Sequence, residues 1–170
     1  MSSEGASSIS LTGRKRTVAR LAAVQALYQI DLSGAKPEAV IAEFVKHRLG
    51  RDVDGQNYGE ADAVLFADIV RGTAARQDDL DRAISGVLTP DWPLARLETV
   101  LRAILRAGAY ELVARADVPA RVAISEYLDV AHAFYAGKEP GLVNGVLDRL
   151  AHHLRPGDLD DGGDGGDAAR

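Results

Sequence analysis

Apolar residues recur every three or four positions along nearly all of the chain between residues 14 and 156, with polar residues between them. This spacing is typical of amphipathic helices, whereas half-buried strands alternate apolar and polar residues. No run of alternating β-branched residues stands out. The pattern therefore predicts an all-α fold.

Glycine and proline residues divide this pattern into about seven helices. Ser33-Gly34 ends the first, and Pro37 opens the second at its first turn. The glycine and prolines of the connection at 86–93 predict a division into two small helical subdomains, and a polar loop is expected at 52–59. The expected helices cover about residues 14–31, 37–49, 60–75, 78–85, 97–112, 124–135 and 142–154.

The first predicted helix has an apolar face and a basic one. At about 100° per residue, five side chains share the face expected to enter the core: Val18, Leu21, Val24, Tyr28 and Leu32. Arg16 and Arg20 fall on roughly the opposite face. Both cations are therefore expected to be available to solvent or to a ligand.

Two residues of the second half stand out against its more apolar helices. Glu111 falls inside a wide apolar stripe, and a buried carboxylate without a partner would be very costly. We expect it to accept backbone N–H groups at the start of a neighbouring helix, rather than to act as a catalytic acid. Asn144-Gly145 could form a hairpin turn, but it lies in helical period, which favours close packing at the glycine.

The ends of the chain differ from its body. Residues 1–13 are rich in Ser, Gly and Ala, and residues 157–170 are an acidic Gly/Asp segment, so both are expected to be disordered. Residues 14–156 would then form one helical domain. The 170 residues include no cysteine, and there is neither a signal-peptide pattern nor an apolar run of the ~18 residues needed to cross a bilayer. We expect a cytoplasmic protein without membrane attachment.

Charge is segregated along the chain. The net charge is −5, but five aspartates and one arginine in the tail account for most of it. Only Glu4 is acidic in the first thirty residues, against four cations: Arg14, Lys15, Arg16 and Arg20. Cations at the start of a helix oppose its macrodipole, so a functional reason such as phosphate contact is favoured over a merely solvated helix end.

A second candidate contact lies near the end of the chain. Phe134 is one turn upstream of Lys138, which lies in the turn before the last predicted helix. An aromatic ring beside a cation can stack a base and neutralise a phosphate of single-stranded RNA, although the sequence alone favours Phe134 as a core residue. Arg102 and Arg106 lie outside the apolar stripe of their helix. They either extend a basic surface or are only solvated side chains on the polar face of that helix.

The motifs of common catalytic and metal sites are missing. There is no phosphate-binding Gly-x-x-x-x-Gly-Lys-Ser/Thr loop and no Gly-x-Ser-x-Gly nucleophile motif. The four histidines do not pair at metal-ligand spacing. We expect no enzymatic activity, no metal and no cofactor.

Several motifs together resemble the NusB family of bacterial transcription antitermination factors. The resemblance begins at Arg14-Lys15-Arg16 and continues through Ala-Val-Gln-Ala-Leu-Tyr at 23–28 and Ala-Tyr-Glu-Leu at 109–112. It ends with Val-Asn-Gly-Val-Leu-Asp at 143–148, so that order and spacing hold over most of the chain. Either of the last two blocks alone would be a weak signal, but together they are specific.

The resemblance implies an RNA-binding adaptor with two helical subdomains. Such proteins pair with the small-subunit ribosomal protein NusE, bind the boxA element of ribosomal RNA transcripts and join the RNA polymerase antitermination complex. It implies RNA contacts at the basic N-terminal cluster, to which Arg16 and Arg20 belong, and at Phe134. Tyr28 matches the tyrosine that faces NusE, and the surface around Leu101 and Arg102 is expected to contact the same partner.

The chain departs from the family pattern at two positions. Gly141-Leu142 stands where Lys-Phe is common, so base stacking is lost there and Lys138 is the candidate to replace the cation. Leu101 stands where an acidic residue is common, which predicts a changed surface toward NusE. Two other functions stay open: a module of the kind that precedes some RNA cytosine methyltransferases, and a protein-interaction scaffold, including a homodimer that hides the basic surface. No methyltransferase domain follows in this sequence, which disfavours the first.

Overall fold

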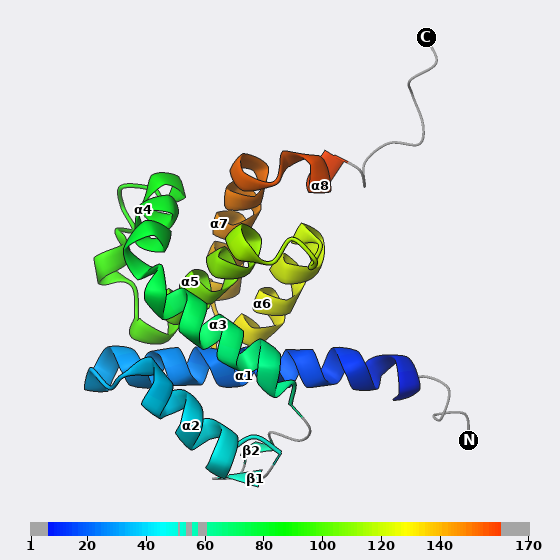
Figure 1. Cartoon of the computed structure of the whole chain (residues 1–170). Helices are drawn as coiled ribbons and strands as arrows, with labels where there is room; N and C mark the ends of the chain where they lie inside the picture. Colours follow the sequence, from blue (N-terminus) through cyan, green and yellow to red (C-terminus); the bar gives the residue numbers. More distant parts are fainter. Residues whose placement is uncertain (1–6, 51, 54–55, 58–60, 161–170) are drawn as a thin grey trace. The chain divides into compact units, whose positions relative to one another are not determined.

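The computed structural model describes residues 7–50, 52–53, 56–57 and 61–160, with side chains over 14–50 and 61–159 (Figure 1). The chain forms two compact units, Met1–Arg76 and Gln77–Arg170. Apart from two very short strands, every regular element in the described part is a helix, so the all-α prediction is confirmed. The two units meet in sequence before α4, however, and not at the predicted connection at 86–93.

The N-terminal unit contains three helices that pack against one another: α1 (Ser7–Ser33), α2 (Pro37–His47) and α3 (Ala63–Ala75). Helix α1 begins at Ser7, within the segment 1–13 that was expected to be disordered, and residues 1–6 lie outside the described residues. The predicted polar loop contains a short antiparallel pair, β1 (Asp52–Val53) and β2 (Gln56–Asn57).

Local contacts fix where α3 begins. An Asp62 carboxylate oxygen accepts the backbone N–H of Leu65 at 2.9 Å, which caps the helix. The backbone N–H of Asp62 in turn donates to the carbonyl of Lys15 at 3.1 Å, so the start of α3 is tied to α1. Between α2 and α3, the rings of Phe44 and Phe66 stack with centroids 5.4 Å apart.

The buried face of α1 is not the predicted one. Four of the five side chains expected on that face are not buried: Tyr28 is exposed, Leu32 is 62% exposed, and Val18 and Leu21 are half-buried. The predicted face is therefore wrong, except at Val24. Alanines can enter a core as readily as larger residues, and here they mark the side that packs most closely. The buried side chains of α1 are Ala19, Arg20, Ala22, Ala23, Val24, Ala26 and Leu27.

The C-terminal unit is built on α5 and α7, which contact each other and both of their neighbours, α4 and α6. Helix α5 is buried along most of its length, as its wide apolar stripe predicts, and Glu111 is fully buried within it. Helix α7 starts at Glu139, so that Lys138 is its N-cap residue. The elements of this unit are α4 (Gln77–Val87), the 3-10 helix η1 (Leu94–Arg96), α5 (Thr99–Ala114), α6 (Ala120–Phe134), α7 (Glu139–Leu154) and α8 (Pro156–Asp160).

Close packing occurs at a different glycine from the predicted one. A Cβ at Gly108 would lie 2.8 and 2.9 Å from the two methyl carbons of Leu147, so α5 and α7 approach each other through this residue. A Cβ at Gly145 would meet nothing within 4 Å. The prediction of close packing at Gly145 is therefore wrong, because this residue faces open space.

The short helix α8 fixes part of the predicted tail to α6. A carboxylate oxygen of Asp158 accepts the backbone N–H of Ala120 at 3.3 Å and also pairs with Arg155. The Leu159 side chain is buried, and its carbonyl accepts from Arg121. The prediction of a disordered tail is thus wrong up to residue 160, and residues 161–170 lie outside the described residues.

Candidate nucleic-acid interface

The basic cluster of the first helix lies within α1 and not at its start. Because α1 begins at Ser7, Arg14 is about two turns from the N-terminus, where the macrodipole has little effect. The macrodipole therefore does not disfavour these cations, and it gives no reason to expect a functional cluster. Arg14 is exposed, and Lys15 and Arg16 are partly exposed, so all three present charge at the surface.

Arg20 differs from the other three cations. It is 2% exposed and among the largest fully buried side chains, so the expectation that it faces solvent is wrong. The reason is the wide alanine face of α1: at about 100° per residue, Arg20 falls between Leu27 and Val24, inside the buried arc. A buried guanidinium must be paired with other groups, and Arg20 does make polar interactions within the protein.

Phe134 and Lys138 flank the connection between α6 and α7. Phe134 is the last residue of α6 and is 36% exposed, so it is a surface aromatic and not a core residue. Lys138 is exposed, and its side chain makes no capping hydrogen bond. The structure therefore brings this aromatic and this cation to the same connection, as their spacing predicts. Burial, followed by the nearby Glu98 carboxylate, raises the pKa of the intervening Tyr135, whose side chain stays neutral.

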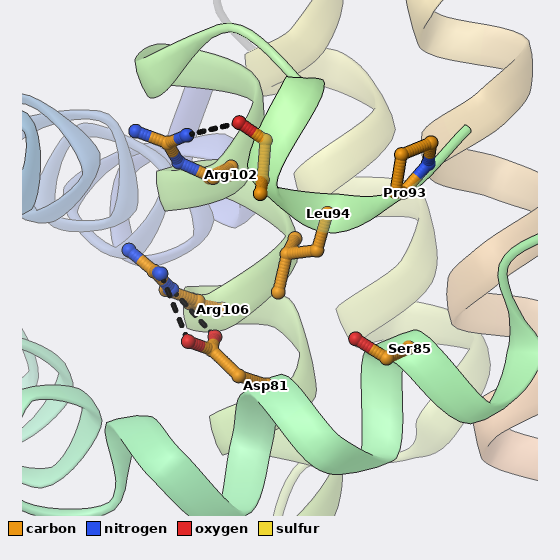
Figure 2. A pocket seen from close by; sticks show the side chains of 7 residues that line it. Asp81, Ser85, Pro93, Leu94, Arg102 and Arg106 are labelled. Atoms are coloured by element: carbon orange, nitrogen blue, oxygen red, sulfur yellow. Dashed lines mark hydrogen bonds and ion pairs between the residues drawn. The ribbon is translucent and has the colours of Figure 1, made fainter.

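The arginines of α5 line a hollow of about 500 Å³ together with residues of α4 and η1 (Figure 2). Arg106 forms a two-pronged ion pair with Asp81, with N–O distances of 2.7 and 2.9 Å. Arg102 donates to the carbonyl of Ala95 at 3.2 Å. Since Arg106 is neutralised by Asp81, the structure favours a structural role for it over an extended basic surface.

Leu101, which was expected on a surface toward a partner, is 3% exposed. It lies on the part of α5 that is buried on nearly every side, so its side chain offers almost no area for contact. Arg102 is partly exposed and Tyr28 is exposed, so these two remain accessible.

One exposed aromatic was not singled out from the sequence. Trp92, the chain's single tryptophan, is 53% exposed in the connection between α4 and η1. It borders a second hollow, of about 270 Å³, with Leu142 and Arg149 of α7 on its other side. The sequence did contain a signal, a single tryptophan between Pro90 and Pro93. This segment was interpreted only as a break between two helices.

Within the described residues, no helix combines the length and the apolar character needed to cross a bilayer. No group of three or more potential ligand side chains in that part of the chain is placed to hold a metal ion.

Comparison with known proteins places the chain in a family. The model of the NusB family matches residues 17–152. The transcription antitermination protein NusB of Brucella ovis is 57% identical over 144 residues, covering 85% of this chain and 84% of its own. The corresponding protein of Brucella anthropi is 56% identical, with 85% and 86% covered.

Solved structures agree with this assignment. NusB of T. maritima superposes with a TM-score of 0.69 at 27% identity, covering 85% of this chain and 96% of that one. A crystal structure of the antitermination factors NusB and NusE in complex with dsRNA gives a TM-score of 0.67 at 26% identity, covering 82% and 98%. The chain therefore belongs to the NusB family of transcription antitermination proteins.

Proposed function

We propose that this protein is a non-enzymatic, cytoplasmic antitermination adaptor that binds boxA-type single-stranded RNA of ribosomal RNA transcripts together with ribosomal protein NusE. The observation that carries the proposal is the 57% identity to a named antitermination protein over 85% of the chain. The related structure of NusB and NusE with dsRNA supports NusE and RNA as partners. Assembly with RNA polymerase then places the bound transcript within an antitermination complex.

Two separate groups of surface residues, one in each unit, are the proposed RNA contacts. Arg14, Lys15 and Arg16 supply cations from α1, and the exposed Phe134 and Lys138 supply a ring and a cation from the α6–α7 connection. Cations neutralise phosphates and aromatic rings stack unpaired bases, which is the combination used for single strands. Arg20 is left out of the contact, because its burial fits a structural role.

The proposed NusE contact uses side chains that the protein leaves uncovered. On α1, the exposed Tyr28 and Leu32 lie one turn apart and form an apolar strip. Exposed aromatic and aliphatic side chains of this kind are common anchors of protein interfaces. On α5, the partly exposed Arg102 is the second proposed contact, whereas Leu101 is too deeply buried to serve.

Each contact is small, so the two partners reinforce each other. When NusE is already bound, the second contact of the RNA becomes an intramolecular event, which raises the affinity without new contacts. Four accessible cations, Arg14, Lys15, Arg16 and Lys138, correspond to a log–log salt dependence with a slope of about −3, at about −0.7 per phosphate of a single strand.

The test is a titration of a fluorescently labelled boxA-type RNA with this protein, with NusE, and with both together. We expect weak binding to each protein alone, tighter binding to the mixture, and the shallow salt dependence given above. A scrambled RNA of equal length and composition is the control. If the three components elute separately from a sizing column at low ionic strength, the proposal is wrong.

A further inference from the structure

The hollow beside Trp92 lies in the C-terminal unit and is separate from the one that contains Arg102 and Arg106. One wall is the connection after α4, with Leu88, Thr89 and Trp92, and the other wall is α7. Its volume of about 270 Å³ is below the range of drug-sized pockets. It therefore suits one flat ring rather than a folded segment. We call it the Trp92 groove.

The backbone at Trp92 is fixed in a turn, and the residue is 53% exposed. Its backbone N–H donates to the carbonyl of Thr89 at 3.0 Å, which closes a turn. Pro90 and Pro93 on either side restrict the backbone further. A large aromatic surface kept at 53% exposure by a rigid turn offers a stacking face with little conformational entropy to lose on binding.

Opposite this ring, α7 has no side chain over part of its surface. Gly141 and Gly145 both line the groove, and a Cβ at either position would meet nothing within 4 Å. Glycine inside a helix is less favourable than alanine. Alanine would fit at both positions and would stabilise the helix, so the glycines lower stability while keeping the groove open.

The charge of the groove suits an anionic chain. Arg149 is the one charged residue among those that line it, and no lining residue is acidic. Its guanidinium donates to the carbonyl of Val87 at 3.1 Å, which holds it against the wall. Lys138, the N-cap residue of α7, is not among the lining residues, but it precedes Gly141 by three residues and so lies about one helical turn before it.

We propose that the Trp92 groove binds one base of the single-stranded RNA, stacked on the Trp92 indole over the surface formed by Gly141 and Gly145. Arg149 and Lys138 contact phosphates on either side of that base. This inference rests on the proposed function, because the same strand must reach Phe134 and Lys138. Leu142, near the start of α7, cannot stack a base. In this proposal Trp92, from the connection between α4 and η1, stacks the base instead.

The direct test uses Trp92 as its own reporter, since it is the only tryptophan in the chain. The protein is titrated with a boxA-type RNA while tryptophan emission and, in parallel, the anisotropy of a label on the RNA are recorded. We expect emission to be quenched with the same midpoint as the anisotropy change. Trp92→Ala should weaken RNA binding about tenfold, and Trp92→Phe should restore part of the loss.

A pair of glycine variants separates groove filling from damage to the fold. Gly145→Ala should raise the thermal midpoint and weaken RNA binding several-fold, because its methyl group occupies the groove. Gly86→Ala is the matched control, since it is also helical, also open within 4 Å, and outside the lining residues. It should leave RNA affinity unchanged.

The outcomes distinguish the groove from the function as a whole. If RNA binds but tryptophan emission does not change and Gly145→Ala binds as tightly as the parent, the groove proposal is overturned and the proposed function stands. If NusE alone quenches Trp92 and RNA does not, the groove is a protein contact and the proposal is again wrong. If RNA binds neither to the protein nor to its mixture with NusE, both proposals fail together.

Discussion

The guanidinium of Arg106 and the carboxylate of Asp81 join α5 to α4 through two hydrogen bonds of 2.7 and 2.9 Å. Their side chains are only 12% and 26% exposed. A two-pronged pair with this degree of burial is better fixed and less screened than a surface ion pair. It holds in place the helix that carries Arg102 and one wall of the hollow in Figure 2.

Removing the charge of Asp81 should therefore destabilise the protein. Asp81→Asn leaves Arg106 partly buried beside a neutral amide, and we expect a loss of about 1–3 kcal/mol in the free energy of unfolding. Urea denaturation measures this loss. Asp79→Asn is the control, because its pair with Arg82 is about three-quarters exposed on both sides and should change stability by less than about 1 kcal/mol. Equal effects of the two variants would contradict the structural role of Arg106.

Gly108→Ala should destabilise the protein even though alanine favours helices. The added methyl group would come within 3 Å of both terminal carbons of Leu147, so the side chain or the helix must shift. Such overpacking costs about 1–3 kcal/mol, more than the gain of up to about 1 kcal/mol in helix propensity. Thermal unfolding checks the sign, and Leu147→Val in the same chain should recover part of the loss. An increase in the thermal midpoint of Gly108→Ala alone would show that α5 and α7 are less closely packed than described.

Arg16→Glu should weaken RNA binding and leave the fold intact. The side chain is partly exposed on α1, and reversing its charge replaces an attraction to phosphate with a repulsion. Anisotropy of labelled RNA and thermal unfolding are measured side by side, with Arg96→Glu on the exposed end of η1 as a control for net charge. A large fall in the thermal midpoint would mean that Arg16 is structural.

Arg20→Glu, four residues later on the same helix, should instead disrupt the fold. Arg20 is buried and makes polar interactions, so a reversed charge in that environment should prevent stable folding. The milder Arg20→Met keeps the apolar length of the side chain and tests the same point, with a lowered thermal midpoint expected. A folded Arg20→Glu that has lost only RNA affinity would return Arg20 to the RNA-binding set.

The exposed pair of Glu38 and Arg71 predicts a pH effect. The hydrogen bond from Arg71 holds the pKa of the Glu38 carboxyl below its ordinary value of 4.5. A carboxyl with a lowered pKa in the folded state adds stability above its unfolded pKa, and that stability is lost as the pH falls through the folded value. An NMR titration should give a pKa below 4.5 for Glu38, and Arg71→Gln should bring it back. If the pKa of Glu38 is the same in Arg71→Gln as in the parent, this pair does not contribute to the loss of stability at low pH.

The helices were predictable because apolar residues recur in them with a strong helical period. The residues at which each helix begins and ends were less predictable. The stripe of α5 with Glu111 inside it was predicted and is buried in the structure. The face of α1 was wrong because it was assigned from large apolar residues, whereas its buried side is made mostly of alanine. The prediction that Arg20 is exposed was wrong for the same reason. Which cations are paired, as Arg106 is, depends on partners far away in sequence.

The site was predictable where it rests on local sequence. Phe134 and Lys138 lie four residues apart, so the chain itself keeps them together. The Trp92 groove could not be found in this way, because its two walls are about fifty residues apart in sequence and meet only through the packing of α4 and α7. Gly145 of α7 was likewise assigned to close packing, which only the neighbours of a residue can decide.

The uncovered strip of Tyr28 and Leu32 on α1 has a practical consequence for handling the protein. Adjacent apolar side chains that are exposed to solvent in the monomer promote self-association as the protein concentration rises. Preparations made without NusE should therefore show concentration-dependent aggregation, and co-expression with NusE should increase the soluble yield.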